Sequence, residues 1–190
     1  LAACTPAVQA PAGQTFTDGL GRSITLTGTP ERIISLAPSN TEILYAIGAG
    51  DQVVGRDEFS NYPEEALAVP TVGGSMGDFN LETIVSLKPD LVLAASINTP
   101  EQVKALEDLG LTVYTLTNPA DMDGMYANLL TVGSLAGKSR EAAELVEELQ
   151  GRVKAVQDKI LPLSYAPLVF YELDGSDPAK PWTMGPNTFL

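Results

Sequence analysis

The chain has 190 residues, a formal net charge of −13 and no histidine, with 44% hydrophobic and 18% charged residues, as in ordinary globular proteins. The lack of histidine excludes Ser-His-Asp and Cys-His catalysis and the common zinc sites, so a general base would have to be a carboxylate, Lys or Tyr. The acidic balance repels nucleic acid and anionic lipid headgroups, and no apolar run reaches the ~20 residues of a membrane-spanning helix.

The single cysteine, Cys4, stands near the beginning of the chain in Leu1-Ala2-Ala3-Cys4. Small residues before a cysteine are typical of a bacterial lipobox, whose cysteine thiol accepts a diacylglycerol after the signal segment is removed. Residues 5–14 lack periodicity and are rich in Pro and Ala, as flexible tethers are. We therefore predict a lipid anchor on Cys4, a tether over residues 1–14 and a location outside the cytoplasm on the cell membrane. The alternative is a chance cysteine in a disordered terminus.

Residues 15–137 alternate between strand and helix patterns. Short apolar runs predict buried strands, and amphipathic stretches with capping residues predict helices. The predicted strands are two short ones within 15–28, then 32–37, 52–55, 90–94 and 112–116, and the predicted helices are 40–47, 81–88, 100–109 and 121–136. This order predicts an α/β lobe of three layers, a parallel sheet with helices on both faces.

Local signals fix several helix ends. Ser39 is predicted to cap the helix 40–47 with Glu42 reaching back, Asn80 to cap the helix 81–88, and Thr99 to begin a capping box with Pro100 at the first helical position. The glycines of 48–55 follow a helix and precede a strand. This order predicts a helix stop and a turn rather than a dinucleotide-binding loop.

A long helix is predicted over Ser139–Ile160, within a linker of residues 138–161. One apolar stripe recurs at every third or fourth residue along it: Ala142, Leu145, Val146, Leu149, Val153, Val156 and Ile160. The apolar stretch 166–173 then predicts a new strand. We expect residues 162–190 to begin a second lobe that is only partly present. The alternative is that this strand returns to the first sheet.

Two stretches carry a family resemblance, PERIISLAPSNTEILYAIGAGDQVVG and FNLETIVSLKPDLVLA. Together with the long helix, they resemble the substrate-binding proteins of ABC importers for iron siderophores, haem and cobalamin. The resemblance implies two α/β lobes joined by one long helix and a metal chelate bound between the lobes. It also implies delivery of that ligand to a permease, without catalysis and without a cofactor.

Candidate ligand-binding residues follow predicted strands, at the carboxyl edge where open α/β sheets bind ligands. Ser39 and Asn40 follow the strand 32–37, and Ile97 and Asn98 follow the strand 90–94. For Ser39 and Asn40 the alternative is simple helix capping. Trp182, the only tryptophan, lies in the second-lobe segment and faces either the cleft or a core.

The resemblance adds two further ligand contacts. Phe59 and Met76 match positions that are aromatic and touch ligand in cobalamin-binding members of the family. A methionine at 76 keeps the pocket apolar but removes a flat stacking face, which argues against cobalamin itself. The alternative for both residues is packing within their loops.

Glu82 matches a glutamate that, in the family, stands on the rim of the cleft and pairs with arginines of the permease. The alternative is a favourable interaction with the helix dipole, since Glu82 lies in a first helical turn. A different function, an acid-dependent hydrolase, would use Asp57, Glu58, Asp78 and Glu82, the acids gathered in loops and at helix starts near one edge.

Overall fold

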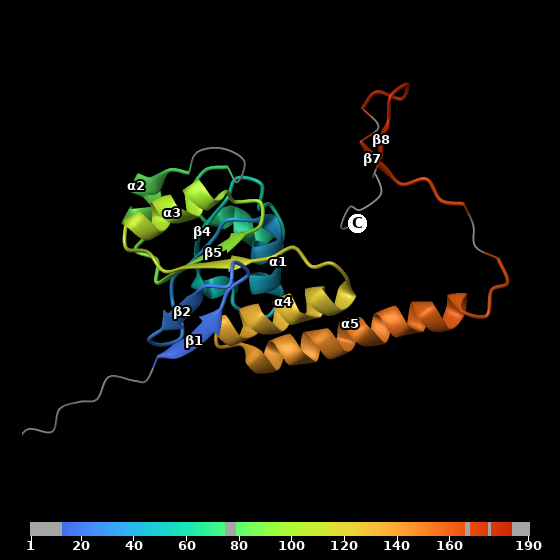
Figure 1. Cartoon of the computed structure of the whole chain (residues 1–190), viewed down its shortest axis with the longest axis horizontal. Coiled ribbons are helices and arrows are strands. Elements are labelled where there is room, and N and C mark those ends of the chain that lie inside the picture. The colour runs from blue at the N-terminus through green and yellow to red at the C-terminus, as the bar shows by residue number, and fades with distance from the viewer. Residues whose placement is uncertain (1–12, 75–78, 166–167, 175, 184–190) are drawn as a thin grey trace, which may run out of the picture.

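The computed structural model describes residues 13–74, 79–165, 168–174 and 176–183. Within these residues a small parallel sheet lies between two layers of helices, and one long helix extends away from the lobe (Figure 1). Three residues that the sequence analysis named as functional candidates, Cys4, Met76 and Asp78, lie outside the described residues. No helix in the described ranges is both long and apolar enough to cross a membrane.

The central sheet has four parallel strands in the order β4-β3-β5-β6. Each lies within one or two residues of a predicted strand, and almost every residue in them is apolar, as expected for strands buried on both faces. The strands are β3 (Ile33–Ser35), β4 (Val53–Arg56), β5 (Leu91–Ala95) and β6 (Val113–Leu116). The predicted parallel α/β sheet is therefore confirmed.

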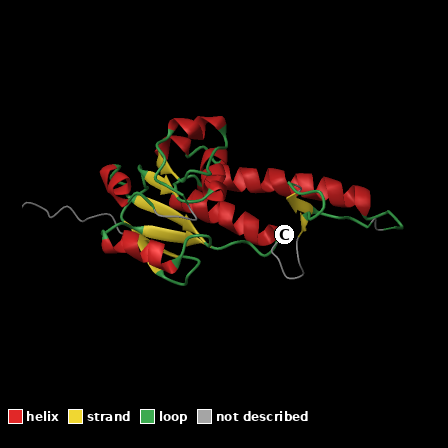
Figure 2. Cartoon of the chain, turned by 90° about the horizontal axis from the view of Figure 1, so that it is seen from above, coloured by secondary structure: helices red, strands yellow, loops and turns green. Residues whose placement is uncertain are grey.

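Side chains alternate between the two faces of the sheet and pack against a different layer of helices on each face. Figure 2 shows helices on both sides of the strands. Ile33, for example, packs with α1 and α4, whereas Ile34 packs with α2 and α3. The helices are α1 (Pro38–Ala46), α2 (Leu81–Ser86), α3 (Pro100–Asp108) and α4 (Met122–Leu135), with short 3₁₀ turns η1 (Gly50–Gln52) and η2 (Glu64–Ala68). This arrangement gives the lobe its predicted three layers.

Two of the three predicted caps are confirmed. The Asn80 carboxamide oxygen accepts the Thr83 N–H at 2.9 Å, and Thr99 forms a complete capping box with Gln102. The cap predicted at Ser39 is wrong, because α1 begins at Pro38, two residues before the predicted start. Pro38 occupies its first turn, and the extended Ala37 is the capping residue. Proline suits this place since its fixed φ is already helical and its missing N–H would have no helical partner.

The chain begins the lobe with an antiparallel hairpin, β1 (Gln14–Thr17) and β2 (Ser23–Leu26), which confirms the two strands predicted there. The turn between them is held to the edge of the sheet. Asp18 is buried there, and its carboxylate accepts hydrogen bonds from the backbone N–H groups of Leu20 and Arg22 and from the Arg22 guanidinium. The Gly19 N–H donates to the Thr115 carbonyl of β6 at 2.7 Å.

The charge of Asp18 is stabilised by these bonds. Burial by itself would raise the pKa of this carboxyl. The side-chain hydrogen bond from Arg22 and the backbone hydrogen bonds from Arg22 and Leu20 together lower it by more than burial raises it, so the pKa lies below its ordinary value. Arg22 also pairs with Glu107 of α3. The hairpin is thereby joined to both the sheet and a helix.

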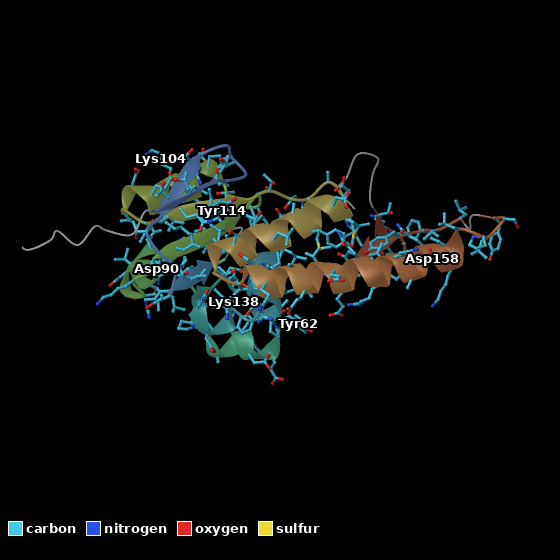
Figure 3. All side chains as sticks on the ribbon, turned by 90° about the horizontal axis from the view of Figure 1, so that it is seen from below. Tyr62, Asp90, Lys104, Tyr114, Lys138 and Asp158 are labelled. Atoms are coloured by element: carbon cyan, nitrogen blue, oxygen red, sulfur yellow. The ribbon has the colours of Figure 1, made fainter. Side chains whose placement is uncertain are left out.

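The long helix α5 spans Ser139–Ile160, the range predicted from its apolar stripe. Its first turns pack on α4, where Gly133 allows close approach: a Cβ atom at Gly133 would lie 2.3 Å from the Cβ of Ala142. Beyond that contact α5 extends past the lobe, with Lys138 just before its first residue and Asp158 near its far end (Figure 3). The far half of the stripe is exposed, with Val156 at 57% and Ile160 at 54%.

After α5 the described residues form a small antiparallel pair, β7 (Glu172–Asp174) and β8 (Trp182–Thr183), which stands apart from the lobe (Figure 1). The strand predicted over 166–173 is therefore much shorter than expected. Its apolar residues 168–171 precede β7 and are exposed. β7 pairs with β8 and not with the four-stranded sheet, so the alternative of a return to the first sheet is wrong.

Candidate functional site

A hollow of about 790 Å³ lies at the carboxyl ends of three neighbouring strands. Its walls come from the loops that follow β3, β5 and β6 and from the first turns of α4. The lining residues are Ala37, Pro38, Ser39, Ala95, Ser96, Ile97, Asn118, Pro119, Asp121, Met122 and Met125. The hollow is thus mainly apolar, with a few hydroxyl and amide groups, as ligand sites commonly are.

Two of the predicted residues meet in this hollow. Ser39 is exposed in the first turn of α1, and Ile97 is exposed in the turn that follows β5. The parallel sheet brings them together because β3 and β5 are adjacent and end at the same edge. The first turn of α1 also has backbone N–H groups without helical partners, which can donate to a ligand.

The two predicted asparagines lie beneath the surface instead. The Asn40 amide Nδ2 donates to the carbonyls of Leu93 and Ala94, both at 3.1 Å, and the side chain is 1% exposed. The Asn98 carboxamide oxygen accepts the Ala95 N–H at 2.8 Å, and that residue is also buried. In this geometry both asparagines hold the ends of β3 and β5 together under the hollow.

Phe59 follows β4 in a loop and is 50% exposed. Its backbone N–H donates to the carboxylate of Asp57 at 2.9 Å, and the Ser60 hydroxyl donates to the other oxygen of that carboxylate. Thr41 of α1 continues the network through its hydroxyl, 2.9 Å from Ser60. A buried polar network therefore fixes the loop that presents Phe59 to solvent, although Phe59 does not line the hollow.

Trp182 lies in β8, 72% exposed, and does not line the hollow. Met76 and Asp78 lie outside the described residues. Glu82 is exposed in the first turn of α2, and it forms no ion pair within the described part of the chain. The structure therefore gathers only part of the predicted ligand set at one place.

Sequence reasoning missed the third wall of the hollow, residues 118–125. The Asn118 N–H donates to the Ser96 hydroxyl at 3.1 Å, which joins the loops after β5 and β6. Asp121 caps α4 by accepting the Gly124 N–H at 2.8 Å, and Met122 and Met125 add two thioethers. The signal was available, because the strand 112–116 was predicted and its carboxyl end belongs to the same edge.

The electrostatic character of the hollow is simple. Among the described residues, Asp121 is the one charged residue in its lining, and no described Lys or Arg belongs to that lining. Within the described ranges no three Cys, Asp or Glu side chains are grouped so that they could hold a metal ion. The hollow can therefore offer an apolar surface, hydroxyls, one carboxylate and two thioethers to a ligand.

A second hollow of about 790 Å³ lies at the outer edge of β4 and is lined by acids and tyrosines. Its polar lining includes Glu42, Tyr45, Asp51, Tyr62 and Glu65. Burial raises the pKa of Tyr45, the neighbouring carboxylates of Glu65 and Asp51 raise it further, and Arg56 offsets part of this rise. None of the predicted site residues lines this hollow.

Asp57 cannot serve the hydrolase alternative as an exposed carboxylate. It is fully buried, and both of its oxygens accept hydrogen bonds within its own loop. Glu58 and Glu82 are exposed. The described geometry provides no surface pair of carboxylates built on Asp57.

Comparison with known proteins gives a consistent result. A family profile described as "Periplasmic binding protein" matches residues 33–188. The chain is 34% identical over 179 residues to an uncharacterized ABC transporter substrate-binding lipoprotein, YvrC, of Bacillus subtilis, covering 93% of this chain and 56% of that protein. It is 35% identical over 176 residues to a cobalamin-binding protein of Halobacterium salinarum, covering 91% of this chain and 46% of the other.

A solved structure agrees with the fold. The periplasmic haem-binding protein RhuT from Roseiflexus, in its apo form, matches with a TM-score of 0.72 and 28% identity, covering 85% of this chain and 61% of RhuT. The chain spans about half the length of the curated relatives it matches. These findings do not support the hydrolase alternative, because the matching proteins are named for binding and transport.

Proposed function

The chain belongs to the periplasmic binding protein family, and from this premise we propose that it is the solute-binding component of an ABC importer, working outside the cytoplasm. The observation that carries the proposal is the apolar hollow at the carboxyl ends of β3, β5 and β6. Open α/β sheets bind ligands at this edge, and nothing in the lining is arranged for bond cleavage. The lobe would bind its ligand and pass it on unchanged.

The ligand would be a metal chelate such as a ferric siderophore, cobalamin or haem. Relatives named for cobalamin and haem binding support this class. Ser39 and Ile97 would contact the chelate from this lobe, joined by Met122 and Met125. Phe59 and Met76 remain proposed contacts that rest on the resemblance, and Trp182 remains one that rests on its place in the second-lobe segment. Asn40 and Asn98 would act from below, by fixing the loops that carry the contacts.

The chemistry of the lining fits a large ligand with an apolar face. Burying apolar surface of a chelate against Ile97 and the two thioethers would supply most of the affinity, at about 25 cal/mol for each Å² removed from water. The Ser39 hydroxyl and the free N–H groups of α1 would orient polar substituents of the chelate.

The test is to purify the protein from its host, in the length that the host makes, and to examine it by native mass spectrometry for a bound chelate. Titration with cyanocobalamin, hemin and a ferric hydroxamate then identifies the class. We expect Ile97→Asp to weaken binding of the chelate that binds, because it places a charge against an apolar face. Leu109→Asp, a similar change at an exposed residue of another surface, is the control. Equal loss in both variants, or turnover of a chelate, would contradict the proposal.

Two partners of the chain are part of the same proposal. Glu82 would pair with an arginine of the permease, since an exposed carboxylate meeting a guanidinium forms a charge-assisted bond. Glu82→Arg should then stop uptake while chelate affinity is kept.

Cys4 would carry the lipid anchor. Cys4→Ser should release the protein from the membrane fraction. If the variant stays in the membrane fraction as the unaltered protein does, the proposed lipid anchor is wrong.

A further inference from the structure

A small apolar groove of about 300 Å³ runs between α2 and α3, outside the hollow described above. It is lined by Phe79, Leu81, Glu101, Gln102 and Ala105. α3 follows β5, and α2 follows the long loop after β4, so the first turns of both helices lie on the carboxyl side of the sheet. Leu81, on one wall, is the neighbour of Glu82 in the first turn of α2.

The carboxylates at this groove have no cation within the described residues. On α3, Lys104 pairs with Asp108 at 2.7 Å, and Glu107 pairs with Arg22. Glu101 forms no ion pair with a described residue, and neither does Glu82. The other charged residues of α3 are thus paired within the described chain, whereas Glu101 in the groove lining and Glu82, next to the wall residue Leu81, remain open to a partner.

We propose that the α2–α3 groove is a docking pocket for the permease, and that it receives an apolar side chain adjacent to an arginine or lysine. The proposal rests on the proposed function and adds two features to Glu82. These are a second carboxylate, Glu101, and an apolar seat formed by the groove residues Phe79, Leu81 and Ala105. Charge complementarity selects this occupant, because a segment carrying a cation beside an apolar group meets both acids and the apolar floor. A second copy of this chain is disfavoured, since each carries a net charge of −13.

The two parts of the groove play different roles. The apolar seat excludes water from the contact, and a charged bond at the edge of a dry seat is stronger than one in open solvent. The carboxylates steer the approach of the partner and fix its orientation. Both acids also stabilise their own helices by lying in first turns, but the helix dipole does not require an apolar seat beside them.

The experiment measures the affinity of the whole protein for its own permease in nanodiscs, without added chelate. Ala105→Trp fills the seat, and Glu101→Lys reverses one charge. We expect each to weaken binding at least about tenfold, and the effect of Glu101→Lys to shrink at high salt. Ala143→Trp and Glu148→Lys, exposed positions on α5, are the matched controls and should bind as the unaltered protein does. Thermal melting of all four variants verifies folding, and Glu101→Lys serves alone if Ala105→Trp does not fold.

The outcomes distinguish a failure of the groove proposal from a failure of the proposed function. If both groove variants bind normally while Glu82→Arg does not, the groove proposal is overturned and the proposed function stands. If the unaltered protein does not bind the permease, both are overturned. Weakening by the groove variants and not by the controls supports the groove.

Discussion

The two halves of α5 share one apolar stripe but have different surroundings. In the first half, Ala142 and Val146 are buried against α4, next to the close approach at Gly133. In the second half, Val156 and Ile160 are more than half exposed. Figure 3 shows that this half of α5, where Asp158 is labelled, extends beyond α4. Periodicity therefore tells which face of a helix is apolar, and the packing of its neighbours tells where that face is buried.

The sharpest way to break this comparison is to separate α4 from the first half of α5. Gly133→Val places side-chain atoms where a single Cβ would already lie 2.3 Å from Ala142 and 3.0 Å from the Lys138 carbonyl. We expect a loss of about 3 kcal/mol in the free energy of unfolding, measured by urea denaturation. Gly133→Ala combined with Ala142→Gly should recover part of the loss of Gly133→Ala alone. A harmless Gly133→Val would show that the two helices do not pack as described.

Elsewhere in the packed lobe, the β1–β2 hairpin depends on a polar attachment at Asp18. Asp18→Asn removes a charge that accepts several hydrogen bonds at a buried site, and we expect it to cost about 2 kcal/mol at pH 7. Because the folded pKa of Asp18 is lowered, its stabilisation is complete above the unfolded value of about 3.9 and is lost as the pH falls through the folded value. The difference between the two proteins should shrink below about pH 4. A difference that is constant from pH 7 to pH 2 would contradict this.

A matched pair of valines compares the two halves directly. Val146→Ala should destabilise the 190-residue chain by about 1.5 kcal/mol, because the side chain is buried between α4 and α5. Val156→Ala, at 57% exposure, should change stability by less than about 0.5 kcal/mol. Equal losses would mean that the second half is covered in solution. A larger loss for Val156→Ala in a longer chain would identify the added residues as that cover.

The smallest expected effect is a gain, at Gly151 in the exposed half of α5. Apart from the backbone of its own helix, a Cβ there would meet no atom of the described residues within 4 Å. Gly151→Ala should therefore stabilise the helix by up to about 1 kcal/mol, because alanine loses less backbone freedom than glycine on folding. Circular dichroism during thermal unfolding measures the change. A loss of stability would indicate a contact on that face.

Much of the fold followed from local signals. Short apolar runs gave all four strands of the sheet, and residues such as Asn80 and Thr99 marked helix starts because their side chains can accept a free N–H of the first turn. The cap predicted at Ser39 was wrong because a proline at position 38 is as good a helix start as a serine cap. In the structure the extended backbone of Ala37 makes that residue the cap, and the helix begins at Pro38. The strand predicted over 166–173 was too long because apolar composition favours a strand, whereas pairing depends on a neighbour.

The sequence by itself predicted most elements of the lobe, their three-layer order and the edge proposed for the ligand, because periodicity, caps and the alternation of strand and helix are local properties of the chain. Only the tertiary structure decided which side chains reach that edge. It placed Asn40 and Asn98 beneath the hollow, since their amides satisfy backbone groups of neighbouring strands, and it added Met122 and Met125 from a helix far along the chain. Such choices depend on contacts between residues distant in sequence, and a one-dimensional pattern does not contain them.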